Sequence, residues 1–366
     1  MINQLMEKIA SDDVMNEAYE WLCQARLNYS ANAYIWDLRQ NWAVLLPLLQ
    51  RQLLAGKFQF SVQTQYRFAD ETKVVWAAMD SLVLKCIAIV LTPFLSPLLS
   101  KRCFNIKGNG GLKAAVRETQ QALSEHQHIY RSDIFSYYAS IQHEILLPEL
   151  QALIPDQRVV SLIASSLARV ETYGGEYYDI NCGISMGSPL SPLLGAIALK
   201  PLDNAMEKLD IFYVRYVDDW CILAKSKFKL RHAIKKMHRV LEKLQMKTHP
   251  DKTFIGRREK SFSFLGFQFC NQALMISKAS FENHQAKRLQ LQEQQVPLQR
   301  LVDYGRRWLG WFTAGVTLAS GYAESIKAGL ADGVGVNLVL IGEGYPATLR
   351  NTEIRWCGLY FQSSDR

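Results

Sequence analysis

The sequence lacks closely spaced cysteines, internal repeats and low-complexity segments. Its 7 cysteines are scattered over 366 residues and none forms a C-x-x-C pair, so neither a disulfide framework nor a zinc site is predicted. Several lie in apolar runs, where free buried thiols are expected, and this favours a reducing, cytoplasmic location.

Long uninterrupted apolar runs are also lacking. The longest, residues 82–99, is broken by Lys85, Pro93 and Pro97, so we expect no membrane-spanning helix and no membrane partner. The first residues lack the basic segment and apolar core of a secretory signal peptide.

The remaining composition is that of a globular protein with a basic surplus. Hydrophobic residues make up 49% and charged residues 21%, which allows one large domain or two to three small ones with a sizeable core. The net charge of +8 suits a polyanionic partner, although a solvated basic surface would give the same number.

Asp218 and Asp219 are adjacent carboxylates between the apolar runs 213–217 and 220–224. The β-branched and aromatic residues on both sides predict two short strands joined by a tight turn at the acid pair. Two acids at the tip of a buried hairpin are unfavourable without a nearby cation, and a pair of divalent metal ions is what in-line phosphoryl transfer uses. Because aspartate also favours turns, an ordinary hairpin turn is the alternative at this point.

Four further motifs accompany the acid pair. Residues 129–141 predict a strand that carries Asp133 and runs into a helix. The others are Met-Gly-Ser-Pro-Leu-Ser-Pro at 186–192, His-Pro-Asp-Lys-Thr at 249–253 and Phe-Leu-Gly-Phe at 264–267. This ordered set resembles the reverse transcriptases, most closely the bacterial branch of retron, group II intron, diversity-generating and phage-defence enzymes. The resemblance covers residues 35–315.

The resemblance implies an α+β right-hand polymerase, with an antiparallel-sheet palm, mixed fingers and a helical thumb. The domains expected are an N-terminal helical segment (1–55), fingers (56–125), a palm (126–275) with a fingers insertion at 144–180, and a helical thumb (276–320). Residues 321–366 match nothing in the family pattern and their role is open.

The resemblance also implies a metal site. Asp133, Asp218 and Asp219 would hold two Mg²⁺ ions, with Mn²⁺ as an alternative, and Ile134 would add its backbone carbonyl. Asp219 could orient rather than ligate. Lys252 would lie near the leaving pyrophosphate as a general acid or phosphate contact, and a solvated turn lysine is the alternative.

Several residues match the family's nucleotide-binding positions. Arg67 and Lys73 are the candidates on a fingers hairpin, and Lys107 on a glycine-rich loop; a solvated surface is the alternative for each. Tyr138 would be the steric gate that excludes a 2′-hydroxyl and so selects deoxynucleotides. Its alternative role is that of an ordinary aromatic at a helix start.

The motif at 186–192 departs from the family pattern. Met186 stands directly before Gly187, where the family commonly has Gln, and a thioether cannot donate a hydrogen bond. Diversity-generating enzymes also have an apolar residue here, but their next residues usually read Ser-Gln, whereas this chain has Ser191-Pro192. We therefore predict relaxed base discrimination.

The resemblance places a primer grip and a thumb near the end of the matched region. Phe264, Leu265, Gly266 and Phe267 would form the hairpin that holds the primer 3′ end; a core strand with a bulge is the alternative. Residues 278–315 predict thumb helices whose basic side chains, among them those of Arg306 and Arg307, would contact the nucleic-acid backbone.

Other secondary-structure expectations are simpler. Residues 1–55, 144–172, 193–209 and 230–244 are expected to be helical, and residues 80–99 to form a buried helix that ends near Pro93 or Pro97. Residues 58–60 and 65–76 are expected to form paired strands around a turn at 70–72.

The sequence thus predicts an RNA-directed DNA polymerase that adds deoxynucleotides to a primer 3′ end. The expected partners are an RNA template, a DNA primer or product, and deoxynucleoside triphosphates, with an accessory protein or second polymerase subunit as a further partner. A dedicated noncoding RNA and antiphage defence are the favoured setting. The alternatives are diversity-generating error-prone synthesis, template-independent DNA synthesis, and a catalytically inactive RNA-binding scaffold.

Overall fold

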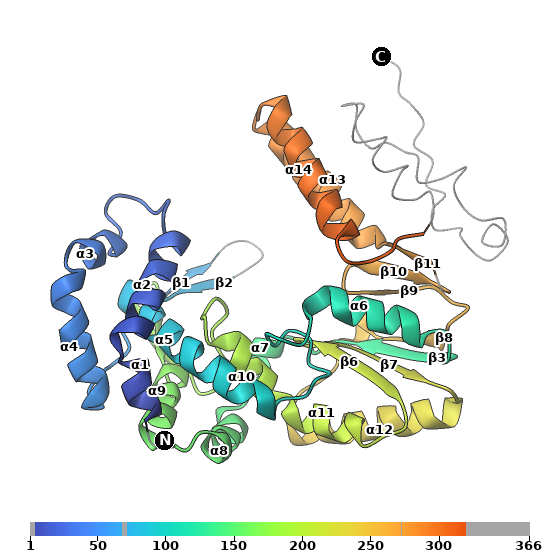
Figure 1. Cartoon of the computed structure of the whole chain (residues 1–366), viewed down its shortest axis with the longest axis horizontal. Coiled ribbons are helices and arrows are strands. Elements are labelled where there is room, and N and C mark those ends of the chain that lie inside the picture. Colours follow the sequence, from blue (N-terminus) through green and yellow to red (C-terminus); the bar gives the residue numbers. More distant parts are fainter. Residues whose placement is uncertain (1–3, 68–71, 272, 320–366) are drawn as a thin grey trace. The chain divides into compact units, whose positions relative to one another are not determined.

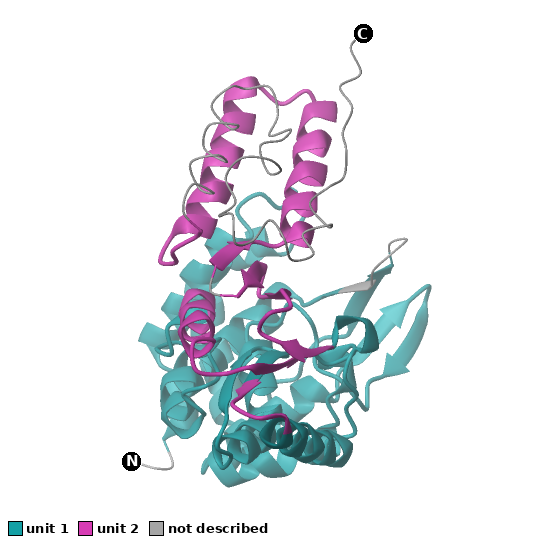
Figure 2. Cartoon of the chain, turned by 90° about the vertical axis from the view of Figure 1, so that its right-hand side faces the viewer, with its two compact units in different colours: residues 1–111, 132–222, 228–253 teal, residues 112–131, 223–227, 254–366 magenta. Residues whose placement is uncertain are grey.

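The computed structural model describes residues 4–67, 72–271 and 273–319. Helices and strands are mixed, which confirms the α+β class. The chain divides into two compact units (Figure 2). Unit 1 comprises residues 1–111, 132–222 and 228–253, and unit 2 comprises residues 112–131, 223–227 and 254–366. The expected turn at 70–72 lies largely outside the described residues, as does the segment 321–366.

Unit 1 begins with a group of helices, as expected (Figure 1). They are α1 Leu5–Ile9, α2 Asp12–Ala25, α3 Ile35–Gln40 and α4 Trp42–Leu54. The buried residues of α2 are Val14, Met15, Ala18 and Leu22, whose spacing of three to four places them on one face. This face packs against α5 Ala78–Leu95.

Helix α5 is apolar on all sides, which is typical of a helix enclosed by protein. It contains Pro93 and is followed by the 3₁₀ turn η1 Ser96–Leu98. By length and composition alone, residues 78–98 are long and apolar enough to cross a membrane, with 56% of the apolar window buried inside the protein. A core helix passes the same test, and the packing of α1, α2 and α3 against α5 is that of a core helix.

A four-stranded sheet in unit 1 has the order β2-β1-β4-β5. Its strands are β1 Gln63–Arg67, β2 Thr72–Val75, β4 Val170–Tyr173 and β5 Glu176–Asp179. β1 pairs antiparallel with β2, with Tyr66 opposite Lys73, and parallel with β4, with Gln63 opposite Glu171.

Two expectations in this region were wrong. Residues 58–60 are not a strand. Phe58 and Phe60, both half-buried, pack edge-on against each other and Phe60 packs against Trp76, and these contacts need no strand ladder. Residues 170–172 belong to β4 rather than to a helix. Glu171 lies there opposite Gln63 and is buried.

The rest of unit 1 positions the acid pair. The expected helix at 144–172 is two helices, α8 His143–Leu153 and α9 Gln157–Leu167. The expected helix at 193–209 is also interrupted at Leu199, which lies between two helices. These are α10 Ser191–Ala198 and α11 Lys200–Glu207, and α11 has Pro201 in its first turn. The hairpin of β6 Phe212–Tyr216 and β7 Asp219–Ala224 follows. After it come α12 Lys227–Lys243, which confirms the helix expected at 230–244, and the 3₁₀ turn η2 Pro250–Lys252.

Unit 2 contains α6 Gly111–Ala122, β3 His128–Ser132 and β8 Phe254–Arg257, and β3 pairs antiparallel with β8. Within this unit the Gln127 N–H also donates to the carbonyl of Ala224. A second sheet has the order β11-β10-β9, formed by β9 Phe262–Phe264, β10 Phe267–Cys270 and β11 Ala273–Ile276. The predicted thumb helices are α13 Lys278–Glu293 and α14 Leu298–Thr313, which lie side by side (Figure 1).

Candidate active site

The acid pair lies at the turn of the β6–β7 hairpin. β6 ends at Tyr216 and β7 begins at Asp219, so Val217 and Asp218 form the connection. Val217 has φ 58°, a left-handed conformation that β-branched residues rarely adopt. The backbone at this turn is therefore strained and needs support from its surroundings.

Two side chains support the turn through the backbone of Val217. Its N–H donates to Oδ1 of Asn105 at 3.0 Å, and its carbonyl accepts from Nη1 of Arg215 at 2.6 Å. Both polar groups of the strained residue are thus satisfied by side chains rather than by the strand ladder.

Arg215 is fully buried, and Asp203 on α11 compensates its charge. Nε of Arg215 donates to Oδ1 of Asp203 at 2.8 Å, and Nη2 donates to Oδ2. The hydroxyl of Tyr213 donates to the same carboxylate at 2.8 Å. Burial alone would lower the pKa of Arg215, but the attraction of Asp203 outweighs it and holds that pKa above its ordinary value. The guanidinium therefore stays charged and supports the turn.

Asp133 follows directly after β3 and is almost fully buried, with 4% of the residue exposed. Its Oδ2 accepts from Nζ of Lys252 at 2.7 Å. Its Oδ1 is buried and has no hydrogen-bond partner among residues 4–67, 72–271 and 273–319. The N–H of His249 donates to the Asp133 carbonyl at 2.9 Å, which fixes the segment that carries Lys252 beside the acid.

Asp133, Asp218, Asp219 and Lys252 act on one another electrostatically. Burial raises the pKa of Asp218, and the negative charge of Asp133 raises it further, while Lys252 and Arg215 oppose the change. The hydrogen bond to Asp133 raises the pKa of Lys252, and the charges of Asp219 and Asp218 add to this. The structure therefore brings these four predicted residues into one site.

The donor set of this site fits a hard divalent cation. An orphaned carboxylate oxygen on Asp133 and mutual repulsion with Asp218 are two unfavourable features that a bound cation would relieve. The side-chain arrangement is not that of a closed metal cluster, because no group of three or more His, Cys, Asp or Glu in the described part of the chain is placed to hold an ion. The Lys252 ammonium, on Oδ2 of Asp133, supplies the positive charge instead. Ile134 is buried beside Asp133, and its bridge partner is Thr248.

Tyr138 lies on the short helix α7 Tyr137–Ser140, next to this site. Burial raises the pKa of Tyr138, and the charge of Asp218 raises it further, which shows that the two side chains are electrostatic neighbours. Its ring packs on Gly195 of α10, where an added Cβ would come within 3.1 Å of Cε1. The ring is thus held against a helix position that only glycine fills without displacing it.

The loop that precedes α10 exposes Met186. The side chain of Met186 is among the exposed apolar groups, with 72% of the residue accessible, and an added Cβ on Gly187 would meet open space. The loop is fixed on the other side: Nε1 of buried Trp76 donates to Oγ of Ser185 at 2.9 Å, and Oγ of Ser191 donates to the Ser185 carbonyl at 2.6 Å.

The three basic nucleotide candidates lie on separate segments of unit 1. Arg67 is exposed at the end of β1, where its guanidinium lies 3.7 Å from the centre of the Tyr173 ring. Lys73 lies on β2, opposite Tyr66. Lys107 is exposed in the loop between η1 and α6. Arg67 therefore already has an aromatic partner within the sheet, and a phosphate would have to share the guanidinium with it.

The predicted primer grip and thumb residues belong to unit 2. Leu265 and Gly266, with φ 50° and 82°, form a two-residue turn between β9 and β10, so the bulge considered from the sequence is not present. Phe264 and Phe267 are buried, whereas Leu265 and Gly266 between them are half-buried. Arg306 and Arg307 are exposed on α14.

Sequence reasoning missed the residues that support the site. Arg215 lies in an apolar strand two positions after Tyr213, and a charge on the same face as a buried tyrosine could have indicated a buried partner. Asn105, Asp203 and Trp76 gave no signal, because each acts through a contact distant in sequence.

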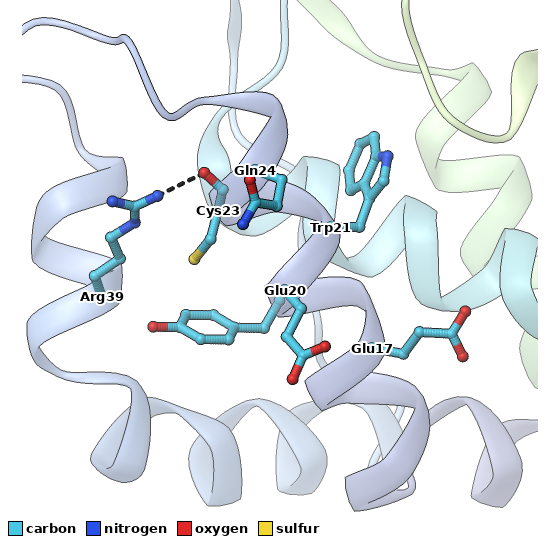
Figure 3. A pocket seen from close by; sticks show the side chains of 7 residues that line it. Glu17, Glu20, Trp21, Cys23, Gln24 and Arg39 are labelled. Atoms are coloured by element: carbon cyan, nitrogen blue, oxygen red, sulfur yellow. Dashed lines mark hydrogen bonds between the residues drawn. The ribbon is translucent and has the colours of Figure 1, made fainter.

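A hollow of about 530 Å³ lies apart from the acids in unit 1, between α2 and α3 (Figure 3). Its lining includes Glu17, Tyr19, Trp21 and Arg39, and Nη2 of Arg39 donates to the carbonyl of Cys23 at 2.5 Å. None of the predicted site residues lines it.

A family model described as reverse transcriptase (RNA-dependent DNA polymerase) matches residues 63–269. The chain belongs to this family. The matched region includes Asp133, Asp218, Asp219 and Lys252.

Individual relatives are distant. Protein YkfC of Escherichia coli (strain K12) is 22% identical over 274 residues, which cover 63% of this chain and 72% of that protein. The putative COX1/OXI3 intron 1 protein of Saccharomyces cerevisiae is 22% identical over 253 residues, covering 67% of this chain and 29% of that protein. The chain thus spans less than a third of the yeast intron protein.

The solved structures to which this chain is similar have TM-scores below 0.5. A chain of the partial Cas6-RT-Cas1–Cas2 complex has a TM-score of 0.40 and 22% identity, covering 66% of this chain and 42% of that chain. Apo telomerase from Candida tropicalis, truncated from its C-terminal domain, has a TM-score of 0.43 and 12% identity, covering 53% of this chain and 45% of that one.

Proposed function

We propose that this reverse transcriptase extends a DNA primer 3′-hydroxyl with deoxynucleotides at the site of Asp133, Asp218 and Asp219, copying an RNA template. One observation carries the proposal. Three carboxylates contributed by two segments distant in sequence act on one lysine, and one buried oxygen of Asp133 has no partner in the described chain. An ordinary hairpin turn would not need Asp133 or Lys252 beside it.

The chemistry follows from the residue types. Two bound Mg²⁺ ions would lower the pKa of the primer hydroxyl and neutralise the leaving pyrophosphate, and Mn²⁺ would substitute for them. Asp133, Asp218, Asp219 and the Ile134 carbonyl would supply the oxygen ligands. Lys252 would hold a proton at the leaving pyrophosphate oxygen, and Tyr138 would exclude a 2′-hydroxyl from the sugar site.

The other predicted contacts complete the proposal. Arg67, Lys73 and Lys107 would contact the triphosphate, the turn at Leu265 and Gly266 the primer, and Arg306 and Arg307 the nucleic-acid backbone. The proposed setting is cytoplasmic antiphage defence with a dedicated noncoding RNA and an accessory protein or second polymerase subunit. It rests on the sequence resemblance to the bacterial branch.

Error-prone synthesis is the second candidate function. The observation that favours it is the exposure of Met186, whose thioether offers no donor where the family commonly has an amide. A diversity-generating role would be expressed as elevated misincorporation on a defined template.

The proposal is tested by sequencing the DNA products and the co-purifying RNA from cells expressing the wild type, Asp218→Asn and Asp210→Asn. Asp210 is an exposed aspartate paired with Lys229 and serves as the matched control. We expect DNA complementary to one abundant RNA in the wild type and in Asp210→Asn, and none in Asp218→Asn. Equal DNA products from all three would refute the polymerase assignment, and products without a complementary RNA would indicate template-independent synthesis.

A further inference from the structure

The segment that leads into the glycine-rich loop is bonded along β6 within unit 1. The N–H of Phe104 donates to the carbonyl of Arg215 at 2.8 Å, and the N–H of Arg215 donates to the carbonyl of Arg102 at 2.9 Å. Cys103 and Arg215 form a parallel bridge. Asn105 comes next on this segment, and its side chain reaches Val217, the residue that follows β6.

Asn105 uses only one end of its amide in this contact. Its Oδ1 accepts from the N–H of Val217 at 3.0 Å and from the thiol of Cys103 at 3.1 Å. Its Nδ2 is buried and has no hydrogen-bond partner in the described part of the chain. In this contact Asn105 therefore acts only as a hydrogen-bond acceptor, and its buried Nδ2 donor, left without a partner in the described residues, is unfavourable.

The acceptor matters because Val217 is held at φ 58°. The left-handed region is strained for a valine, and here Asn105 binds the N–H while Arg215 binds the carbonyl. Asp218 is the next residue, so the direction of its carboxylate depends on this backbone conformation.

We infer that Asn105 is a positioning residue of the catalytic turn, and that it couples the segment 101–111, which carries exposed Lys107, to the carboxylate of Asp218. A displacement of this segment changes the turn through one hydrogen bond to Val217. The inference rests on the proposed polymerase function, and it adds that the loop and the acid respond to each other.

A double-mutant cycle between Asn105→Ala and Val217→Gly tests the coupling. Glycine adopts positive φ without strain, so the acceptor should matter less in its presence. We expect Asn105→Ala to lower the maximal rate of single-nucleotide incorporation by about 10- to 100-fold, as for a backbone donor left unsatisfied, with a smaller change in the KM for the nucleotide. In the Val217→Gly background the same substitution should lower the rate by less than about threefold.

Asn109→Ala is the matched control. Asn109 lies in the same loop, and its Nδ2 donates to the carbonyls of Ser100 and Cys103 at 3.0 and 2.9 Å, so it holds the loop without reaching the turn. Its effect on the rate should be the same with Val217 or glycine at position 217. The inference is overturned if Asn105→Ala lowers the rate by the same factor in the wild-type and Val217→Gly backgrounds. It is also overturned if Asn105→Ala leaves the rate unchanged.

The urea midpoints of the four proteins in the cycle provide a readout that needs no activity. Asn105→Ala should lower the midpoint in the wild-type background and lower it less in the Val217→Gly background. If the shifts of the urea midpoint are additive in the double variant, Asn105 and Val217 do not interact, and the inference is refuted. An inactive wild type with coupled midpoints would instead refute the proposed function and leave the support of the turn by Asn105 in place.

Discussion

The ammonium of Lys252 donates to Oδ2 of Asp133 at 2.7 Å, while Oδ1 of the same carboxylate has no partner in the described part of the chain. The half-exposed Lys252 ammonium thus forms an ion pair with one oxygen of the buried Asp133 carboxylate. Because the lysine can move into water, whereas the acid cannot, this ion pair is a replaceable source of positive charge at the site.

The first prediction concerns this replacement. Lys252→Met leaves the Asp133 carboxylate without its cation, and we expect it to lower the free energy of unfolding by about 1 kcal/mol in chelator, discounted because the lysine is exposed. Mg²⁺ should then stabilise Lys252→Met more than the wild type in thermal melts. Lys252→Arg is the control, because it keeps the charge. Equal Mg²⁺ shifts in all three proteins would show that Lys252 and the metal do not share a site.

The second prediction separates the three acids. Asp133→Asn and Asp218→Asn should each lower primer extension by at least about 100-fold, because each removes a charged ligand for the proposed ions. Asp219→Asn should lower it by a comparable factor, because Asp219 is proposed as a third carboxylate ligand, and a much smaller loss would assign Asp219 an orienting role instead. Steady-state incorporation with a primed RNA template measures all three, with unchanged thermal melts as the folding control. Full activity in Asp133→Asn would contradict the site.

The third prediction concerns sugar selection by Tyr138. Removing the ring that packs on Gly195 should open space at the sugar, so Tyr138→Ala is expected to raise ribonucleotide relative to deoxynucleotide incorporation by about 10-fold or more. Tyr138→Phe keeps the ring and should retain discrimination. The ratio of kcat/KM for the paired nucleotides measures the effect, and an unchanged ratio in Tyr138→Ala would remove Tyr138 from the sugar site.

The fourth prediction concerns fidelity. Met186→Gln introduces an amide on the exposed loop, and we expect fewer misincorporations per nucleotide copied from a defined RNA. Met186→Leu, which is apolar and of similar volume, should keep the wild-type error rate. Sequencing of the products gives both rates. If the error rate does not fall in Met186→Gln, the residue at position 186 does not determine fidelity.

The fifth prediction concerns the acid stability of the contact between helices α13 and α14. His284 on α13 is buried between the rings of Tyr304 and Trp308, and neither ring nitrogen has a hydrogen-bond partner among the described residues. Burial, together with the nearby positive charge of Arg288, lowers the pKa of His284 to about 4. A depressed folded-state pKa means that the unfolded chain binds the proton first, so stability present above pH 6.5 is lost as the pH falls toward 4.

His284→Phe should remove this loss, because phenylalanine keeps an aromatic ring in the stack and does not titrate. Between pH 7 and pH 4.5 we expect the wild type to lose about 2 kcal/mol more unfolding free energy than the variant. Urea denaturation followed by tryptophan fluorescence at several pH values provides the comparison. Parallel pH profiles would place the acid sensitivity elsewhere.

The local features of the fold were predictable because they depend on neighbouring residues. The β-branched and aromatic runs around Asp218 gave the hairpin, and the helix expected at 230–244 is α12, which buries Leu230, Ala233, Met237 and Leu241. The same rules failed where packing replaces the pattern. The alternation at residues 58–60 suggested a strand, yet the half-buried Phe58 and Phe60 pack on each other, and Phe60 on Trp76, without a ladder.

The support of the candidate site could not be predicted from one sequence. Asp133, Asp218, Asp219 and Lys252 were found because their motifs surround them. Asn105 has no such context, since its partner Val217 is 112 residues away and the contact depends on a backbone angle. The Pro201 signal for a new helix was present in the sequence, but the apolar pattern across Leu199 masked the break.

The buried Arg215–Asp203 pair also limits how this sequence can drift over evolution. Loss of one partner leaves a charge that no water can solvate, at a cost of about 3–5 kcal/mol, so single substitutions at either position are expected to be purged. Replacing both by apolar residues avoids that penalty, but it removes the donor to the carbonyl of Val217. Homologues with a neutral pair at these positions should therefore have a glycine in place of the valine.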